Sequence, residues 1–201
     1  IGADPSEIIF TGCGTESDNT AVRGVAESAG KGIRIVTTRV EHLAVLGPCR
    51  GLKDKGFEVV ELGVDRAGQL DLAELRAAVA GGPALVSTMW ANNETGVVFP
   101  IAEIAATAKE AGAVMHTDAV QAAGKLPIDV RNIPVDLLSF SGHKIHAPKG
   151  IGVLYVRKGT RLAPFMLGGH QENGRRGGTE NVPYIVGLGK ACELAAADVK
   201  A

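Results

Sequence analysis

Short apolar runs alternate with longer helix-patterned segments along most of the chain. Apolar residues at helical spacing mark the longer segments, and the short runs are rich in β-branched residues. Such alternation with short connections predicts one α/β domain, built as a mostly parallel seven-stranded sheet with helices on both faces. The predicted strands span 7–11, 33–38, 57–62, 84–89, 113–117, 135–140 and 150–156, and the predicted helices span 17–28, 43–55, 71–80 and 100–111.

Composition narrows the function classes. The chain has 201 residues, a net charge of -1 and 45% hydrophobic residues, which suits a globular domain with a substantial core. The near-neutral charge gives no electrostatic argument for binding nucleic acid or an acidic membrane surface. No run reaches the roughly 18 apolar residues of a membrane-spanning helix. We expect a cytoplasmic protein, because three widely spaced cysteines form no disulfide framework.

Both ends of the chain suggest a segment of a longer protein. The first residues, Ile1 to Pro5, include neither an initiator Met nor a basic leader, and residues 191–201 read as a helix cut in mid-run. We expect burial for the three cysteines, Cys13, Cys49 and Cys192, because free cysteines are usually buried.

Polar motifs follow several predicted strands, at the sheet edge where ligands bind in such folds. The turn from Cys13 to Ser17 opens a helix, so its backbone N–H groups and the Thr15 hydroxyl could bind a phosphate next to Gly14. An ordinary helix N-cap is the alternative. The turn lacks the glycine and lysine pattern of nucleotide-binding loops.

Three further positions carry side chains with cofactor chemistry. Asp118 ends a strand and could pair with the ring nitrogen of pyridoxal phosphate, or merely cap the next helix. Gln121 follows and could donate to a phenolate oxygen. Lys144, behind a Ser-Gly-His turn, could form a Schiff base with an aldehyde cofactor, whereas a lone lysine is usually solvated. Ser141 and His143 would then face the same phosphate as Thr15.

Histidines allow two interpretations. His42 follows a strand, and its ring could stack on a pyridine face and move protons near neutral pH, or be an ordinary polar residue. A metal site is the rival interpretation, but no HExxH motif or paired Cys/His spacing supports it. Its candidate ligands would be His42, His116, Asp118, His143 and His146.

Together these motifs closely resemble cysteine desulfurases of the NifS-like group, within the class V aminotransferases. The resemblance extends over essentially the whole chain in order. It rests on the runs FTGCGTESDNTA at 10–21, VEHLAVL at 40–46, MWANNETGVVFPI at 89–101, HTDAVQAAGKLPIDV at 116–130, LSFSGHKIHAPKGIGVLYVRKGTR at 138–161 and GGHQENGRRGGTENVPYIVGLG at 168–189.

The resemblance implies a residue for each part of a pyridoxal phosphate site. Lys144 would hold the cofactor, Asp118 would pair with the ring nitrogen, and Gln121 would bind the phenolate oxygen. His42 would stack on the ring and transfer protons, and Asn93 would lie near the ring and the substrate carboxylate. Phosphate ligands would be Gly14, Thr15, Ser141 and His143, with Thr179 reaching the phosphate of a neighbouring subunit.

The same resemblance implies the large domain of a fold-type-I enzyme over residues 1–201, without its N-terminal segment and C-terminal small domain. The implied activity converts L-cysteine to L-alanine and an enzyme persulfide, whose sulfur goes to an iron–sulfur scaffold protein. The NifS-like wording tilts this towards nitrogen fixation, and a homodimer is implied. Alternatives are a selenocysteine lyase or another class V enzyme, and an inactive fragment that serves as a dimerising or acceptor-binding module.

Two departures from the family pattern matter. The family's nucleophilic cysteine and its substrate-clamping arginine lie beyond the SGHK motif, outside this chain, so we expect the chain alone to turn over cysteine poorly. Asn173 stands where the family commonly has arginine, near the implied dimer contact.

Overall fold

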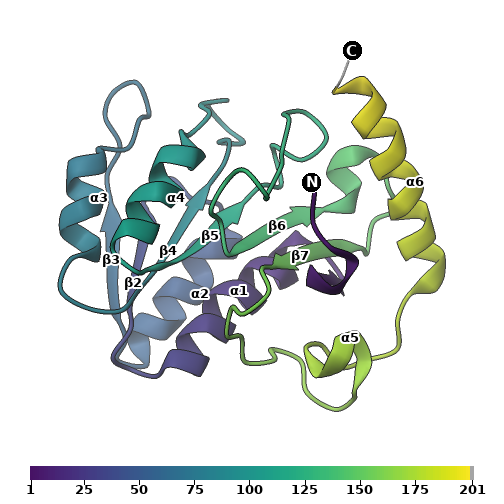
Figure 1. Cartoon of the computed structure of the whole chain (residues 1–201), viewed down its shortest axis with the longest axis horizontal. Coiled ribbons are helices and arrows are strands. Elements are labelled where there is room, and N and C mark those ends of the chain that lie inside the picture. The colour runs from purple at the N-terminus through teal and green to yellow at the C-terminus, as the bar shows by residue number, and fades with distance from the viewer. Residues whose placement is uncertain (200–201) are drawn as a thin grey trace.

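The computed structural model describes residues 1–199, with seven strands and helices that cover them (Figure 1). The strands are β1 (Ile8–Thr11), β2 (Arg34–Thr38), β3 (Glu58–Leu62), β4 (Ala84–Met89), β5 (Val114–Asp118), β6 (Leu137–Ser141) and β7 (Gly152–Val156). The α-helices are α1 (Gly14–Ala29), α2 (Leu43–Asp54), α3 (Leu72–Val79), α4 (Ile101–Glu110), α5 (Gln171–Gly174) and α6 (Val182–Asp198), and two short 3-10 helices are η1 (Pro5–Glu7) and η2 (Gly142–Ile145).

The sheet order is β1-β7-β6-β5-β4-β2-β3. Strands β3, β2, β4, β5 and β6 run parallel to one another, and only β7 runs against its neighbours β6 and β1. The prediction of a mostly parallel seven-stranded sheet is therefore confirmed. The carboxyl ends of β2, β4, β5 and β6 consequently meet at one edge, where the polar motifs follow them.

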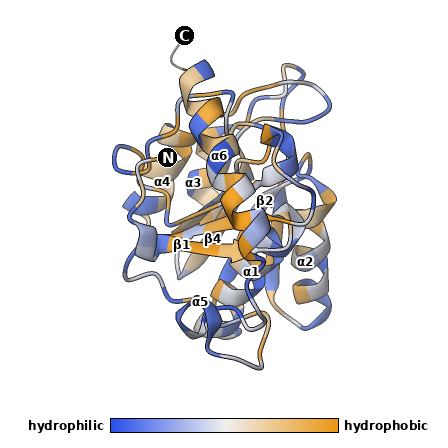
Figure 2. Cartoon of the chain, turned by 90° about the vertical axis from the view of Figure 1, so that its right-hand side faces the viewer, coloured by the Kyte–Doolittle hydropathy of each residue, from blue (hydrophilic) through white to orange (hydrophobic). Residues whose placement is uncertain are grey.

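Each strand feeds two hydrophobic cores, because successive side chains point to opposite faces. Ile35 packs with the core under α1 and α2, while its neighbour Val36 packs with the core under α3 and α4. Leu85 and Val86 divide in the same way. Figure 2 shows the strands as an apolar layer between helices, which accounts for the burial of every residue of β4.

Helix boundaries follow local capping. Asp71 accepts a hydrogen bond from the Ala73 N–H at 2.7 Å and so starts α3 where the sequence predicts. The helix predicted over 100–111 begins one residue later, at Ile101, because Pro100 lies at the N-cap of α4. The predicted start of α1 at Ser17 is wrong by three residues, because the helix begins within the glycine turn at Gly14.

Ile1, the first residue, is exposed at the surface. The helix expected over 191–201 is the end of α6, which reaches Asp198, and positions 200–201 lie outside the described residues. Within residues 1–199, no helix is both long enough and apolar enough to cross a membrane.

Candidate active site

Nine of the ten predicted site residues line one cleft at the carboxyl ends of the parallel strands. The cleft has a volume of about 220 Å³. Side chains from the first turn of α1, from the start of α2 and from the ends of β5 and β6 converge there. The predicted residues that line it are Gly14, Thr15, His42, Asn93, Asp118, Gln121, Ser141, His143 and Lys144.

The turn before α1 is closely packed against the far side of the cleft. A Cβ at Gly14 would lie 2.9 Å from the Val120 Cγ2 and 3.2 Å from the Ser141 Cβ, so this approach requires glycine. Cys13 occupies the N-cap position without a side-chain capping bond, while the Glu16 carboxylate accepts from the Gly12 N–H at 2.7 Å. The turn is therefore not an ordinary side-chain N-cap, and it presents Gly14 and Thr15 to the cleft.

Asp118 is buried at the end of β5. Its Oδ1 accepts from the Val120 N–H at 2.8 Å, so the predicted capping role is present in one oxygen. Among the described residues, Oδ2 has no hydrogen bond and remains available to a ligand. Burial raises the pKa of this carboxyl, while the Val120 N–H and His42 act in the opposite direction.

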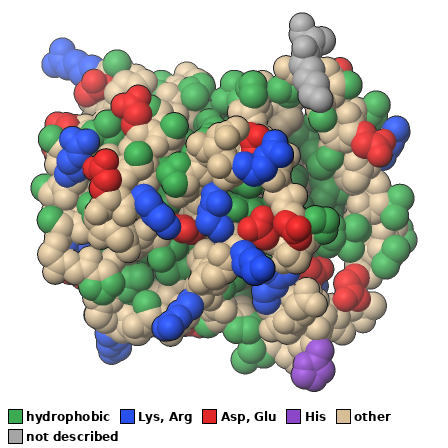
Figure 3. All heavy atoms as spheres, viewed as in Figure 1, with side chains coloured by type: hydrophobic (Ala, Val, Ile, Leu, Met, Phe, Trp, Pro, Cys, Tyr) green, Lys and Arg blue, Asp and Glu red, His purple; other side chains and the backbone are tan. Residues whose placement is uncertain are grey.

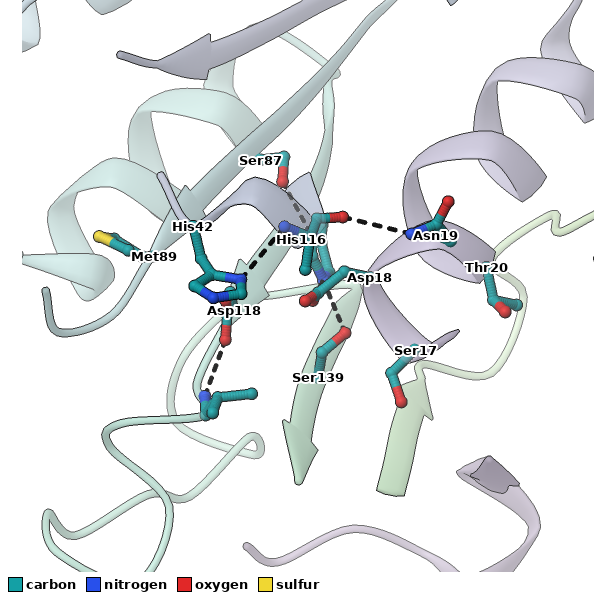
Figure 4. Close-up of polar contacts among 12 residues, drawn as sticks. Ser17, Asp18, Asn19, Thr20, His42, Ser87, Met89, His116, Asp118 and Ser139 are labelled. Atoms are coloured by element: carbon teal, nitrogen blue, oxygen red, sulfur yellow. Dashed lines mark hydrogen bonds and ion pairs between the residues drawn. The ribbon is translucent and has the colours of Figure 1, made fainter. Parts of the chain in front are cut away.

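His42 lies over Asp118 in the cleft (Figure 4). It is the N-cap of α2, and its Nδ1 accepts from the Ala44 N–H at 3.1 Å. This bond fixes the ring orientation and leaves Nε2 as the nitrogen that can exchange a proton with a ligand. The helix start therefore positions a flat ring at the cleft.

Lys144 lies in η2, one turn beyond the end of β6. The short helix ends at His146, whose φ of 65° is left-handed and turns the chain away from the site. In the same turn the Ser141 Oγ and the His143 Nδ1 form a hydrogen bond of 2.8 Å. The SGHK motif thus brings a hydroxyl, an imidazole and an amine to the cleft together.

Amide side chains occupy the remaining side. The Gln121 Oε1 accepts from the Lys125 Nζ at 2.7 Å, which leaves the amide nitrogen as the donor that the prediction requires. Asn92 supports its neighbour Asn93: the Asn92 Oδ1 accepts from the N–H groups of Glu94 and Thr95, both at 2.9 Å. This bonding holds the ANNETG turn in place with Asn93 at the cleft.

Thr179 is the one predicted residue that the structure does not bring to the cleft. It lines a separate cavity of about 190 Å³ together with Arg176. Arg176 pairs with Glu16 at 2.8 Å, which ties this loop to the first turn of α1. Asn173, the position that departs from the family pattern, has a φ of 58°, a conformation that asparagine tolerates better than most residues.

Three buried polar residues at or beneath the cleft were given no part in the cofactor site from the sequence pattern. Asp18 and His116 are buried between α1 and the sheet, and Glu41 is buried just before His42. Asp18 lies on the inward stripe of α1 with Ala21, Val22 and Val25. A charged residue on an apolar helical stripe was the sequence signal that could have found it.

The expected burial of the three cysteines is wrong for Cys13, and Cys192 is only half-buried. Cys49 is buried as expected, and burial raises the pKa of its thiol to about 12, but Cys13 is exposed because it faces the cleft.

Three of the histidines considered as metal ligands have other partners: both ring nitrogens of His116 bond to hydroxyls, and the Nδ1 atoms of His42 and His143 bond to the Ala44 N–H and the Ser141 hydroxyl. Within residues 1–199, no group of three or more potential ligands is placed to hold a metal ion.

Comparison with known proteins identifies the family of this chain. The family model for class V aminotransferases matches residues 1–201. The chain belongs to this family. Cysteine desulfurase 2 of Trichormus variabilis is 55% identical over 200 residues, covering 100% of this chain and 50% of the relative. Cysteine desulfurase NifS of Azotobacter vinelandii is 53% identical over 196 residues, covering 97% of this chain and 49% of the relative.

Solved structures agree. A NifS-like protein superposes with a TM-score of 0.95 at 44% identity, covering 98% of this chain and 55% of that one. SspA in complex with cysteine gives a TM-score of 0.91 at 42% identity, covering 95% and 56%. The predicted resemblance to NifS-like cysteine desulfurases is confirmed. The chain spans about half the length of the curated relatives that it matches.

Class V aminotransferases and cysteine desulfurases depend on pyridoxal phosphate, which confirms the predicted cofactor. The cleft fits this group on three observations. Asp118 offers a buried carboxyl with a free oxygen, Gly14 leaves space that a Cβ would fill, and Lys144 brings an amine to the same cleft. These are the groups that a pyridine nitrogen, a phosphate and an aldehyde require.

Proposed function

We propose that this chain is the cofactor-binding domain of a pyridoxal-phosphate-dependent cysteine desulfurase. The observation that carries the proposal is that Lys144, Asp118 and His42 line one cleft with the glycine turn of α1. The names of the relatives support the same activity, L-cysteine to L-alanine with transfer of sulfur. We extend the proposal to the domain boundary: residues 1–201 form the large domain of a longer protein.

Each residue has a distinct role in this proposal. The Lys144 amine holds the cofactor through its aldehyde, and the Asp118 carboxylate holds the proton of the ring nitrogen. The bound cofactor supplies an electron sink that stabilises negative charge at the substrate Cα. His42 would hold the ring by stacking and would move a proton through Nε2, because its Nδ1 accepts from the Ala44 N–H. The Gln121 amide nitrogen donates to the phenolate oxygen.

The phosphate and the substrate use the rest of the cleft. Gly14, Thr15, Ser141 and His143 bind the phosphate, since backbone N–H groups at a helix start and nearby hydroxyls favour an anion. Asn93 orients the ring and the substrate carboxylate. Nine of these assignments concern residues of one cleft, and the tenth, Thr179, reaches the phosphate site of a second subunit.

A homodimer is part of the proposal, and exposed apolar side chains support it. They lie on the loop before α5 and along α6. Figure 3 shows hydrophobic side chains at the right edge of the molecule, where α6 runs. Burial of such residues against a second copy would be favourable. The exposed residues concerned are Met166, Leu167, Val182, Tyr184, Val186 and Leu194.

The decisive experiment follows pyridoxal phosphate by its visible absorption. We expect the absorption of the lysine-bound cofactor in the wild type, its loss in Lys144→Ala, and its retention in Lys149→Ala. Lys149 is the matched control because it is exposed and lies outside the cleft. A folded wild-type protein without this absorption would contradict the cofactor site.

Turnover tests the activity separately. The protein that contains this domain should convert L-cysteine to equal amounts of alanine and cysteine-derived sulfur, delivered to a thiol or an iron–sulfur scaffold protein. Cleavage of selenocysteine but not cysteine, or formation of a keto acid in place of alanine, would indicate another class V activity. Bound cofactor without any turnover would point to a binding module.

A further inference from the structure

A second carboxyl borders the cofactor cleft. Asp18, on the second turn of α1, is 1% exposed and lines the cleft together with Asp118 (Figure 4). Among residues 1–199, its Oδ1 has no hydrogen-bond partner. A buried carboxyl without a counter-ion is costly in its ionised form, because the protein replaces the water that would solvate the charge.

The nearest basic group does not supply the missing charge. The His116 Nε2 lies 3.6 Å from the Asp18 Oδ1, too far for a hydrogen bond. That nitrogen is 2.9 Å from the Ser139 hydroxyl, and Nδ1 is 2.8 Å from the Ser87 hydroxyl. Burial lowers the pKa of His116 to about 3, so the ring is neutral and no ion pair forms with Asp18.

The other ionisable groups around Asp18 also fail to supply a positive charge. Burial raises the pKa of Asp18 well above its ordinary value, and the nearby carboxyls of Asp118 and Glu41 and the thiol of Cys13 raise it further, while the Ser139 hydroxyl acts in the opposite direction. These groups come from the turn before α1, the segment after β2, β5 and β6. The remaining ionisable side chains of the cleft are His42, His143 and Lys144.

A ring nitrogen would act on the two carboxyls unequally. Asp118 has an oxygen free towards the cleft and a backbone N–H on the other, and both features favour its ionised form beside a cation. Asp18 lies deeper, with Ser139 and the neutral His116 as its neighbours. The proton of the pair therefore belongs on Asp18.

We propose that Asp18 is a positioning residue that stays protonated, so that Asp118 alone carries the charge that holds the cofactor's ring nitrogen. This inference rests on the proposed cofactor site. It assigns Asp18 the role of a neutral carboxyl beside Asp118, with His116 as its uncharged neighbour. The part of the cleft around Asp18 and Asp118 then contains one negative charge for one positive ring nitrogen.

Infrared spectroscopy tests the proton directly, because the C=O stretch of a carboxylic acid is distinct from that of a carboxylate. With pyridoxal phosphate bound at pH 7, we expect an acid band that Asp18→Asn removes and Asp118→Asn does not. Glu41→Gln is the matched control, since Glu41 is a second buried carboxyl whose pKa burial raises to about 8. It should remove a different acid band and leave that of Asp18.

Affinity and stability give two further measurements. Asp18→Asn should weaken pyridoxal phosphate binding at pH 7 by less than about threefold, because the amide resembles the neutral acid. It should also reduce the loss of stability that the cofactor-free protein shows as pH rises, since a raised pKa makes ionisation of Asp18 in the folded protein unfavourable.

Several outcomes would overturn the inference. They are an acid band unaffected by Asp18→Asn, an acid band lost only in Asp118→Asn, or a loss of affinity above tenfold in Asp18→Asn. If that variant does not fold, carbon-13 carboxyl titration of aspartate-labelled wild type decides whether Asp18 keeps its proton at neutral pH. Absence of cofactor binding in wild type would instead contradict the proposed function, and this inference with it.

Discussion

The two ends of the parallel strands differ in whether the polar groups there have hydrogen-bond partners. At the amino end, Arg157 donates to the carbonyls of Val130, Val135 and Ile133 at 2.6 to 3.0 Å, and the Asp136 carboxylate accepts from the Met115 N–H at 2.8 Å. At the carboxyl end, buried carboxyl oxygens of Asp18 and Glu41 have no partner among the described residues.

This difference separates a structural end from a functional end. Satisfied polar groups stabilise the fold, whereas a buried carboxyl left without a partner costs stability and is retained where a ligand or a proton completes it. The cleft lies at the end with the incomplete groups. Substitutions at the amino end should therefore lower stability and leave cofactor binding unchanged. Substitutions at the carboxyl end should change cofactor binding without lowering stability.

The largest effect is expected at Asp118. Asp118→Asn should weaken pyridoxal phosphate binding by about 100-fold or more, on the order of 3 kcal/mol for a buried charge pair that loses one partner. The unfolding free energy of the cofactor-free protein should not fall, because burial already disfavours the charged form. Absorbance titration and chemical denaturation measure the two quantities. An equal loss of cofactor affinity and of unfolding free energy would show that the two ends of the strands do not differ in this way.

Glu41→Gln tests how much stability is lost by burying a carboxyl that has one oxygen without a hydrogen-bond partner. The folded pKa of about 8 lies above the ordinary 4.5, so Glu41 favours folding below pH 4.5 and that contribution is lost as pH rises towards 8. Glutamine should therefore stabilise the protein at pH 8 relative to pH 5 by on the order of 3 kcal/mol. Denaturation at both pH values measures this difference. A gain that is independent of pH would contradict the titration.

Arg157→Met tests the structural end. The methionine keeps much of the side-chain volume but leaves three carbonyls without their donor, at a cost of about 2 kcal/mol in unfolding free energy. Pyridoxal phosphate affinity should be unchanged within twofold, because Arg157 lies at the opposite edge of the sheet from the cleft. A large change in affinity would show that the two ends are coupled. Lys158→Met, at an exposed neighbour, is the control for loss of charge.

The smallest effect concerns His116. Its pKa of about 3 lies below the ordinary 6.5, so the folded protein binds fewer protons than the unfolded one in that range and loses stability on acidification. The contribution is at most about 1.4 kcal/mol per pH unit. Buried carboxyls change stability with the opposite sign. The informative quantity is therefore the unfolding free energy of the wild type minus that of His116→Gln, measured at pH 6 and at pH 5. Identical pH slopes would show that His116 does not remain neutral.

Local sequence determined most of the framework. Alternation of apolar runs and helical periods specifies the strands and their order along the chain, and Asp71 places the start of α3, because these signals act over a few residues. The motifs at strand ends also indicated nine residues of one cleft, since parallel strands bring their carboxyl ends to the same edge. Cofactor chemistry followed from those side-chain types.

Tertiary structure decided what distance and burial control. The antiparallel β7 between β6 and β1, the pairing of Arg176 with Glu16, and the exposure of Cys13 depend on contacts between distant segments. The same holds for the two carboxyls. Asp18 and Asp118 stand 100 positions apart in the sequence, and only the packing of α1 on β5 and β6 brings them to one cleft, where removal of water changes which of them carries a proton.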